Sequence, residues 1–173
     1  MTRKYFVVDH NPLWLEQFQT EEKLLKEVFD KAAVNIHHIG STAIPSIKAK
    51  PIIDILIEVS ALIEVDQLNP KLLELGYEAK GENGIAQRRY FQKGGKRRSH
   101  HLHCFISDHP EVERHLNFRD YLIAHPEKAM EYSDLKHRLS TENGGDREAY
   151  LSGKEPLIKQ FDKEAEMWSR SLK

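Results

Sequence analysis

The sequence is poor in residues that cross-link a chain or hold it in a membrane. Only one of its 173 residues is a cysteine, Cys104, so an internal disulfide is excluded and a reducing compartment is expected. No apolar run reaches the roughly 20 residues that a membrane helix needs. The opening MTRKYFVVDHNP lacks the apolar stretch and small-residue cleavage site of a signal peptide. We therefore expect a cytoplasmic protein with no membrane partner.

The sequence also has no excess of charge of one sign. The formal net charge is −1, so bulk electrostatics give no support to a general nucleic-acid-binding role. Nucleic acid is therefore not the favoured partner, and contact with it would depend on a local basic patch. Hydrophobic residues make up 39% and charged residues 31%, as in ordinary globular proteins. Length and composition predict a single domain over residues 1–173.

The spacing of apolar residues predicts an α+β fold, with a small mixed sheet, helices packed on one side and a helical C-terminal part. No internal repeat or long linker interrupts it. Strands are expected at 34–39, 52–59, 77–80, 88–92 and 101–106, and helices at 12–33, 68–75, 110–124, 126–141 and 155–168.

The stretch HHIGSTAIPSIKAKPIIDILIEV, residues 37–59, carries more polar groups than packing requires. Gly40, Ser41 and Thr42 form a turn directly after a strand, where backbone N–H groups and hydroxyls can hold phosphate oxygens. Asp54 lies within an apolar strand, where a carboxylate is costly to bury without a cation or donors. A phosphate-binding turn and one acidic residue are the parts of a magnesium–phosphate site.

Structural roles compete with this interpretation. The Gly-Ser-Thr turn could simply cap a helix, and Asp54 could be an ion-paired core residue that contacts Lys48 or Lys50. Lys50 is also a candidate phosphate ligand, because it stands just before the strand that carries Asp54. His37 and His38 face opposite sides of their strand, so at most one can join the site, and the position of His38 before the turn favours it.

A second candidate for phosphate binding is a local basic cluster. It follows one strand and the glycine-containing loop after it, and a solvated hairpin is the competing interpretation. Arg89 is the member that we select as a phosphate ligand. The cluster comprises Arg88, Arg89, Lys93, Lys96, Arg97 and Arg98.

The same segments carry a family resemblance over nearly the whole chain. HIGSTAIPSIKAKPIIDILIEV closely resembles the signature of the GrpB family, also called UPF0157. Other matching segments follow in the expected order: Asn-Pro-Leu-Trp at 11–14, Leu-Gly-Tyr at 75–77, His-His-Leu-His at 100–103 and Phe-Arg-Asp-Tyr-Leu at 118–122. The resemblance implies the nucleotidyltransferase fold of the DNA polymerase beta superfamily. Enzymes of that superfamily carry a Gly-Ser turn and three acidic residues that hold magnesium ions.

This sequence departs from that acidic set. Gly40 and Ser41 match the turn and Asp54 matches the first acid, but the second acid position is Leu56. Glu58 lies about 13 Å along the strand from Asp54, too far to share an ion with it.

The strand expected to carry the third acid presents His101 and His103 instead. The candidate catalytic residues are thus Asp54, His101 and His103, and the candidate metal ligands are Asp54 and His103. The ion would be Mg²⁺ or Mn²⁺, or Zn²⁺ because imidazole suits it. A packed, hydrogen-bonded histidine pair is the structural alternative.

Three functions remain open. The first is a nucleotidyltransferase-fold protein that binds a nucleotide or another phosphorylated small molecule with a divalent ion, and could transfer a nucleotidyl or phosphoryl group. The second, favoured by Leu56, is a non-catalytic nucleotide-binding module. The third is a single-metal hydrolase built on Asp54 and the histidines. Whether the protein is an enzyme is left open.

Overall fold

The computed structural model describes residues 5–142 and 144–173, and the chain falls into two compact units. We call residues 12–39 and 52–113 the sheet unit, and residues 5–11, 40–51 and 114–173 the helical unit. Each unit is assembled from separate segments of sequence. The single domain over 1–173 stays a prediction.

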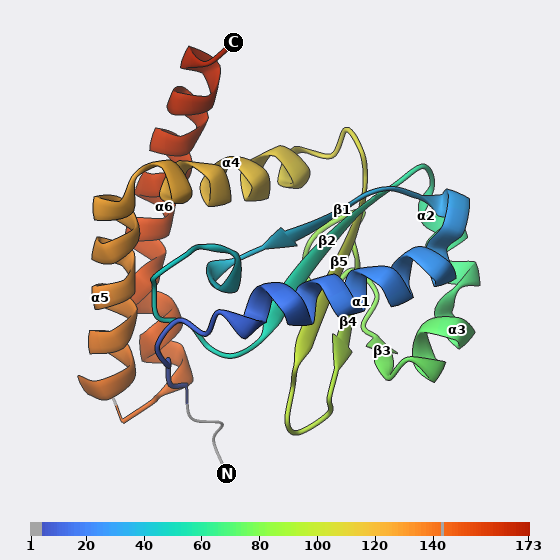
Figure 1. Ribbon diagram of the computed structural model, residues 1–173, viewed down its shortest axis with the longest axis horizontal. Coiled ribbons are helices and arrows are strands. Elements are labelled where there is room, and N and C mark those ends of the chain that lie inside the picture. The colour runs from blue at the N-terminus through green and yellow to red at the C-terminus, as the bar shows by residue number, and fades with distance from the viewer. Residues whose placement is uncertain (1–4, 143) are drawn as a thin grey trace. The chain divides into compact units, whose positions relative to one another are not determined.

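The sheet unit is built on a five-stranded mixed sheet with the order β1-β2-β5-β4-β3 (Figure 1). β2 and β5 pair in parallel, and the other neighbours are antiparallel. Asp54 on β2 lies opposite Ile39 on β1 and His101 on β5. The strands are β1 (Ala33–Ile39), β2 (Ile53–Val59), β3 (Tyr77–Ala79), β4 (Arg89–Lys93) and β5 (His100–Ile106).

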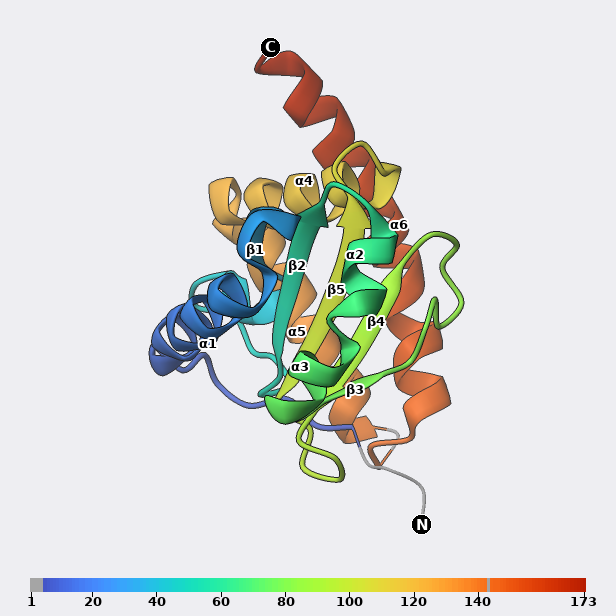
Figure 2. The ribbon, with the colours of Figure 1, turned by 90° about the vertical axis from the view of Figure 1, so that its right-hand side faces the viewer.

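Helices cover one face of this sheet, as Figure 2 shows for α1 (Leu13–Phe29), α2 (Leu62–Gln67) and α3 (Asn69–Glu74). A short 3₁₀ turn, η1 (Asp30–Ala32), leads from α1 into β1. The side chains of Ile53, Ile55, Ile57 and Val59 are at most 1% exposed. The opposite face of β2 carries Asp54, Leu56 and Glu58 because side chains alternate along a strand. Sequence reasoning missed α2, because a helix of six residues is too short to show a clear helical period.

The helical unit contains η2 (Ser41–Ala43), α4 (Pro110–Ala124, which begins in the sheet unit), α5 (Pro126–Glu142) and α6 (Arg147–Ser171). Its core joins residues of the loop after η2 to these helices. The buried members are Ile44, Ile47, Tyr121, Leu122, Ala129, Tyr132, Phe161 and Ala165.

Helix α6 begins at Arg147, not at residue 155 as the sequence pattern predicts. Asp146 caps it by accepting a hydrogen bond from the backbone N–H of Ala149 at 2.9 Å. Gly153 lies inside the helix and allows close packing on α5, because a Cβ there would lie 2.5 Å from Cδ2 of Leu139. A residue that weakens an isolated helix is thus used for tertiary packing.

The α+β class, the small mixed sheet and the helical C-terminal part are confirmed. No helix within residues 5–142 and 144–173 has both the length and the apolarity needed to span a bilayer.

Candidate functional site

The face of the sheet opposite α1–α3 carries a row of polar side chains around Asp54. Strand register places them together, because residues that face each other across strands share a side of the sheet. They come from four strands and the residue just before β4. The set consists of His37, Asp54, Glu58, Arg88, Tyr90, Gln92, His101 and His103.

Asp54 is the centre of this face. Its Oδ1 lies 3.3 Å from Nδ1 of His101 and 3.3 Å from Nε2 of His103. Its side chain is 28% exposed, so it remains accessible. Burial acts to raise the pKa of Asp54, but hydrogen bonds and charge from His101 and His103 outweigh it and hold that pKa well below its ordinary value. Asp54 is therefore an ionised carboxylate, and it pairs with His101 and His103.

Arg88 determines how His103 is oriented. Nη1 of Arg88 lies 3.4 Å from Nδ1 of His103, and a guanidinium can only donate. In the neutral ring Nδ1 is thus the acceptor, and the proton is on Nε2, toward Asp54. The other guanidinium nitrogens of Arg88 donate to backbone carbonyls of Glu82 and Asn83.

His101 differs from His103 in that one of its ring nitrogens has no hydrogen-bond partner among the described residues. Its Nδ1 faces Asp54, while its Nε2 is buried and has no hydrogen-bond partner in the described residues. A neutral imidazole whose Nδ1–H points at a carboxylate has an acceptor lone pair on Nε2. Nε2 of His101 is therefore an unsatisfied acceptor within this face.

The acidic set around Asp54 is too small for a pair of metal ions. Leu56, where a second acid would stand, is fully buried, and Glu58 is engaged with Nε2 of His37 at 2.6 Å. Within residues 5–142 and 144–173, no group of three or more His, Cys, Asp and Glu residues is arranged to hold a metal ion. The proton of His103 Nε2 also occupies the position that a metal would take. The residues do not fit the two-ion site of the superfamily.

The Gly-Ser-Thr turn belongs to the helical unit. Gly40 has φ +73°, a backbone conformation that favours glycine, and η2 follows it. The hydroxyl of Ser41 accepts a hydrogen bond from Nζ of Lys136 at 2.8 Å, and the same ammonium donates to the carbonyl of Lys48 at 2.6 Å. Thr42 is buried.

Lys136 is a buried lysine in a basic environment. Its side chain is 2% exposed, and its Nζ lies 4.5 Å from the ring centroid of Tyr132. Burial first, and then the charges of Lys154 and Lys50, lower the pKa of Lys136 to about 7. Lys136, Lys50 and Lys154 therefore concentrate positive charge in the helical unit, and we call them the lysine group.

Aromatic rings accompany the other two members of the lysine group. Nζ of Lys50 lies 3.9 Å from the ring centroid of Tyr5, and Nζ of Lys154 lies 4.9 Å from that of Tyr150. Ring faces favour cations without neutralising them.

Two predicted residues lie elsewhere. Arg89 is on the helix-covered face, where its guanidinium pairs with Asp66 at 2.7 and 3.3 Å. Its phosphate-binding role stays a prediction, and Arg88 is the arginine on the face of Asp54. His38 stacks on Phe18 of α1 with ring centroids 4.7 Å apart, so selecting His38 over His37 for that face was wrong.

Sequence reasoning also missed Lys136, although a signal existed. The buried positions of α5 are Ala129, Tyr132, Ser133, Lys136 and Leu139, at helical spacing. A lysine within an apolar helical stripe must satisfy its charge inside the protein, which marks it for attention. The role of Arg88 had no such signal, because only the strand register shows that it faces His103.

Comparison with known proteins gives the family. A family model described as GrpB protein matches residues 4–164. This chain belongs to the GrpB family. The UPF0157 protein YqkA of Bacillus subtilis is 47% identical to this GrpB-family chain over 168 residues, which are 97% of the chain and 49% of that relative. The chain thus spans about half the length of YqkA.

Solved structures agree with this assignment. Conserved protein GrpB from Enterococcus faecalis matches with a TM-score of 0.90 and 38% sequence identity, covering 94% of this chain and 99% of that one. A cytoplasmic RNA terminal U-transferase matches with a TM-score of 0.53 at 13% identity, covering 75% of this chain and 40% of that one. At that identity the second match shows the fold alone, which is nucleotidyltransferase-like.

Proposed function

We propose that this GrpB-family protein binds a nucleotide or another phosphorylated small molecule. The observation that carries the proposal is the contact between the buried ammonium of Lys136 and the hydroxyl of Ser41 in the Gly-Ser turn. An ammonium, a hydroxyl and two further lysines are groups that bind phosphate oxygens. A buried ammonium is costly without an anion, so a phosphate that contacts it would recover part of that cost.

Charge supports the same choice of ligand. The overall net charge is −1, so the lysine group is a local concentration and not a sample of a basic surface. The phosphorylated ligands to compare are therefore inorganic phosphate, pyrophosphate and nucleoside mono- and triphosphates. Binding should weaken with rising salt concentration because it depends on charge.

Isothermal titration calorimetry and thermal shift with these ligands test the proposal, since a ligand that binds only the folded state raises its stability. Lys136→Met keeps the length of the side chain and removes the ammonium. We expect it to weaken phosphate-ligand binding about tenfold or more, as for loss of a hydrogen bond to a charged group.

Lys159→Met is the matched control. Lys159 is on α6, its side chain is 70% exposed and it pairs with Glu155. It should bind as the wild type does. If no phosphorylated ligand binds the wild type, or if both variants bind equally well, the proposal is wrong.

A non-catalytic role is favoured over two-ion nucleotidyl transfer by one observation, the fully buried Leu56 at the second acid position. The test is release of pyrophosphate from nucleoside triphosphates with Mg²⁺ or Mn²⁺. Binding without release supports the module. Release that is lost in Asp54→Asn would support transfer or hydrolysis.

A single divalent ion at Asp54 and His103 is the alternative metal hypothesis, and it requires the proton to leave Nε2 of His103. Metal content of the purified protein, compared between wild type and Asp54→Ala, decides it. One ion per chain that disappears in the variant would support the ion. Titration of Zn²⁺ and Mn²⁺ without heat or stability change in the wild type would contradict it.

A further inference from the structure

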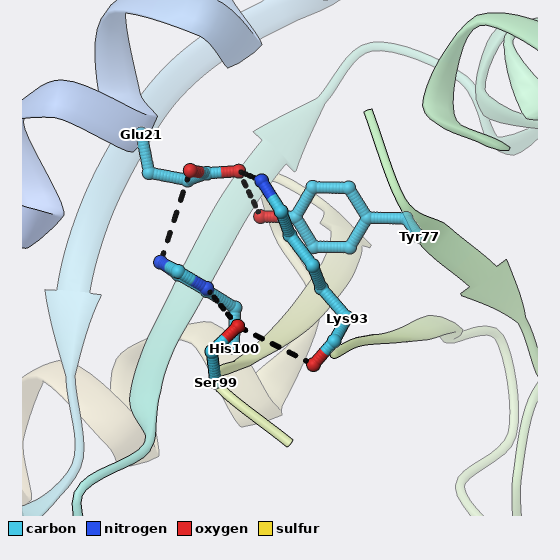
Figure 3. A network of polar contacts seen from close by, with 5 residues as sticks. All are labelled: Glu21, Tyr77, Lys93, Ser99 and His100. Carbon is cyan, nitrogen blue, oxygen red and sulfur yellow. Dashed lines mark hydrogen bonds and ion pairs between the residues drawn. The ribbon is translucent and has the colours of Figure 1, made fainter. Parts of the chain in front are cut away.

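A notch of about 370 Å³ lies on the helix-covered side of the sheet unit, remote in sequence from the turn and on the other face from Asp54. Helix α1 supplies most of its lining and the start of β5 supplies the rest. The lining residues are Leu13, Glu16, Gln17, Thr20, Glu21 and His100. Figure 3 shows the polar network beside it, in which Glu21 contacts Tyr77, Lys93 and His100.

The two oxygens of Glu21 have different surroundings. Oε1 accepts hydrogen bonds from Oη of Tyr77 and from Nζ of Lys93, each at 2.8 Å. Oε2 faces Nε2 of His100 at 3.8 Å, which is too long for a hydrogen bond (Figure 3). The Glu21 side chain is 6% exposed, so this carboxylate has little water to complete its hydrogen bonding.

The contacts of His100 are compatible with a proton on either ring nitrogen. The Ser99 hydroxyl donates to the carbonyl of Lys93 at 3.5 Å, and its oxygen lies 2.8 Å from Nδ1 of His100. When that oxygen accepts from Nδ1–H, a lone pair remains on Nε2 of the neutral ring, and this is the tautomer that an N–H donor in the notch requires. Burial is the main cause that lowers the pKa of His100 from its ordinary value, so the neutral ring is favoured.

In the tautomer with the proton on Nδ1, Nε2 of His100 and Oε2 of Glu21 are two acceptors that face each other at the wall of the notch. Nε2 of His100 is buried and has no hydrogen-bond partner in the described part of the chain. An unsatisfied buried acceptor beside a carboxylate oxygen calls for a group with at least two N–H donors. Anions are disfavoured because Glu16 and Glu21 both line the notch, and the ammonium of Lys93 is already bonded to Glu21.

We propose that this notch binds the ammonium group of a small primary amine. One N–H donates to Oε2 of Glu21 and a second to Nε2 of His100, while the carbon chain lies against Leu13, whose side chain is exposed. Glu16 adds attraction for the positive charge. The site is independent of the phosphate ligand, since it uses none of the lysine group.

Butylammonium is the probe, and butanol is the neutral compound of similar size. The wild-type protein, with ¹⁵N-labelled histidines, is titrated with each in NMR experiments that observe the imidazole nitrogens. Butylammonium should move the His100 Nε2 signal saturably, and butanol should not. Equal effects of both compounds would mean an adventitious apolar contact only, and no saturable shift would mean no site; either result overturns the proposal.

His100→Phe keeps a ring and removes the acceptor. We expect it to weaken butylammonium binding about tenfold, as for loss of a hydrogen bond to a charged group. His137→Phe, at an exposed position of α5, is the matched control and should bind as the wild type does. Unchanged binding by a folded His100→Phe protein contradicts the proposal, and the wild-type titration decides the question if that variant does not fold.

Discussion

The ammonium of Lys136 and the hydroxyl of Ser41 meet at 2.8 Å although 95 positions separate them in sequence. The contact joins the Gly-Ser turn, which is easily recognised in the sequence, to Lys136 of α5, whose buried position the sequence indicates only weakly. It also buries a positive charge, and that burial has a measurable consequence for stability.

Stability should depend on pH through Lys136. Its pKa is about 7 in the folded protein against 10.5 as a free side chain. Between these values the unfolded chain holds a proton that the folded protein releases, so the free energy of unfolding rises with pH, by up to about 1.4 kcal/mol per unit. Lys136→Met lacks this pH-dependent contribution. The free energy of unfolding of the variant should therefore exceed that of the wild type at pH 7, and the difference should shrink toward pH 9.

Urea unfolding of both proteins at pH 7, 8 and 9 measures this difference. Contributions of other titrating groups cancel when wild type and variant are compared. Parallel pH dependences would show that Lys136 keeps an ordinary pKa in the folded protein.

The tautomer of His103 should depend on Arg88. With the guanidinium at Nδ1, the neutral ring carries its proton on Nε2, next to Asp54. Arg88→Met removes the donor, so a mixture of tautomers is expected. Long-range ¹H–¹⁵N NMR spectra distinguish the two ring nitrogens, and a wild-type spectrum with the proton on Nδ1 would contradict the assignment.

The β4–β5 loop should tolerate a methyl group at one glycine and not at its neighbour. Gly94 has φ +102°, and a Cβ there would lie 2.5 Å from the carbonyl oxygen of Arg97. Gly95 has φ +55° and open space around it. Alanine at either position is strained by the left-handed backbone conformation, but Gly94→Ala must also displace backbone atoms. Gly94→Ala should therefore lower the free energy of unfolding by roughly 2 kcal/mol more than Gly95→Ala. Chemical denaturation of the two variants measures this, and equal costs would refute it.

Gly153 and Leu139 should be energetically coupled. Alanine normally stabilises a helix interior relative to glycine by about 1 kcal/mol. Here the added Cβ would lie 2.5 Å from Cδ2 of Leu139, so Gly153→Ala should destabilise the wild type. In a Leu139→Ala background the same change should stabilise by about 1 kcal/mol, because the obstacle is gone. A double-mutant cycle with no coupling would contradict this packing.

Most of the fold could be predicted because its signals are local. The turn at Gly40, the almost uninterrupted apolar run of β2 and the period of α4 and α5 each act within one segment. The errors occurred where packing overrides propensity. The start of α6 was placed at residue 155 and not at Arg147, because Gly153 is a poor helix former that here packs against Leu139.

The residues of the candidate site were also predictable from the sequence only in part. The sequence by itself determined the family, the Gly-Ser turn, Asp54 and the absence of a second acid at Leu56, because these depend on residue identity alone. Only the tertiary structure decided that Arg88 orients His103, that His101 retains a free nitrogen and that Lys136 reaches Ser41. Hydrogen bonds form between atoms a few ångströms apart, and strand register and helix packing, which act over the whole chain, decide which atoms come that close.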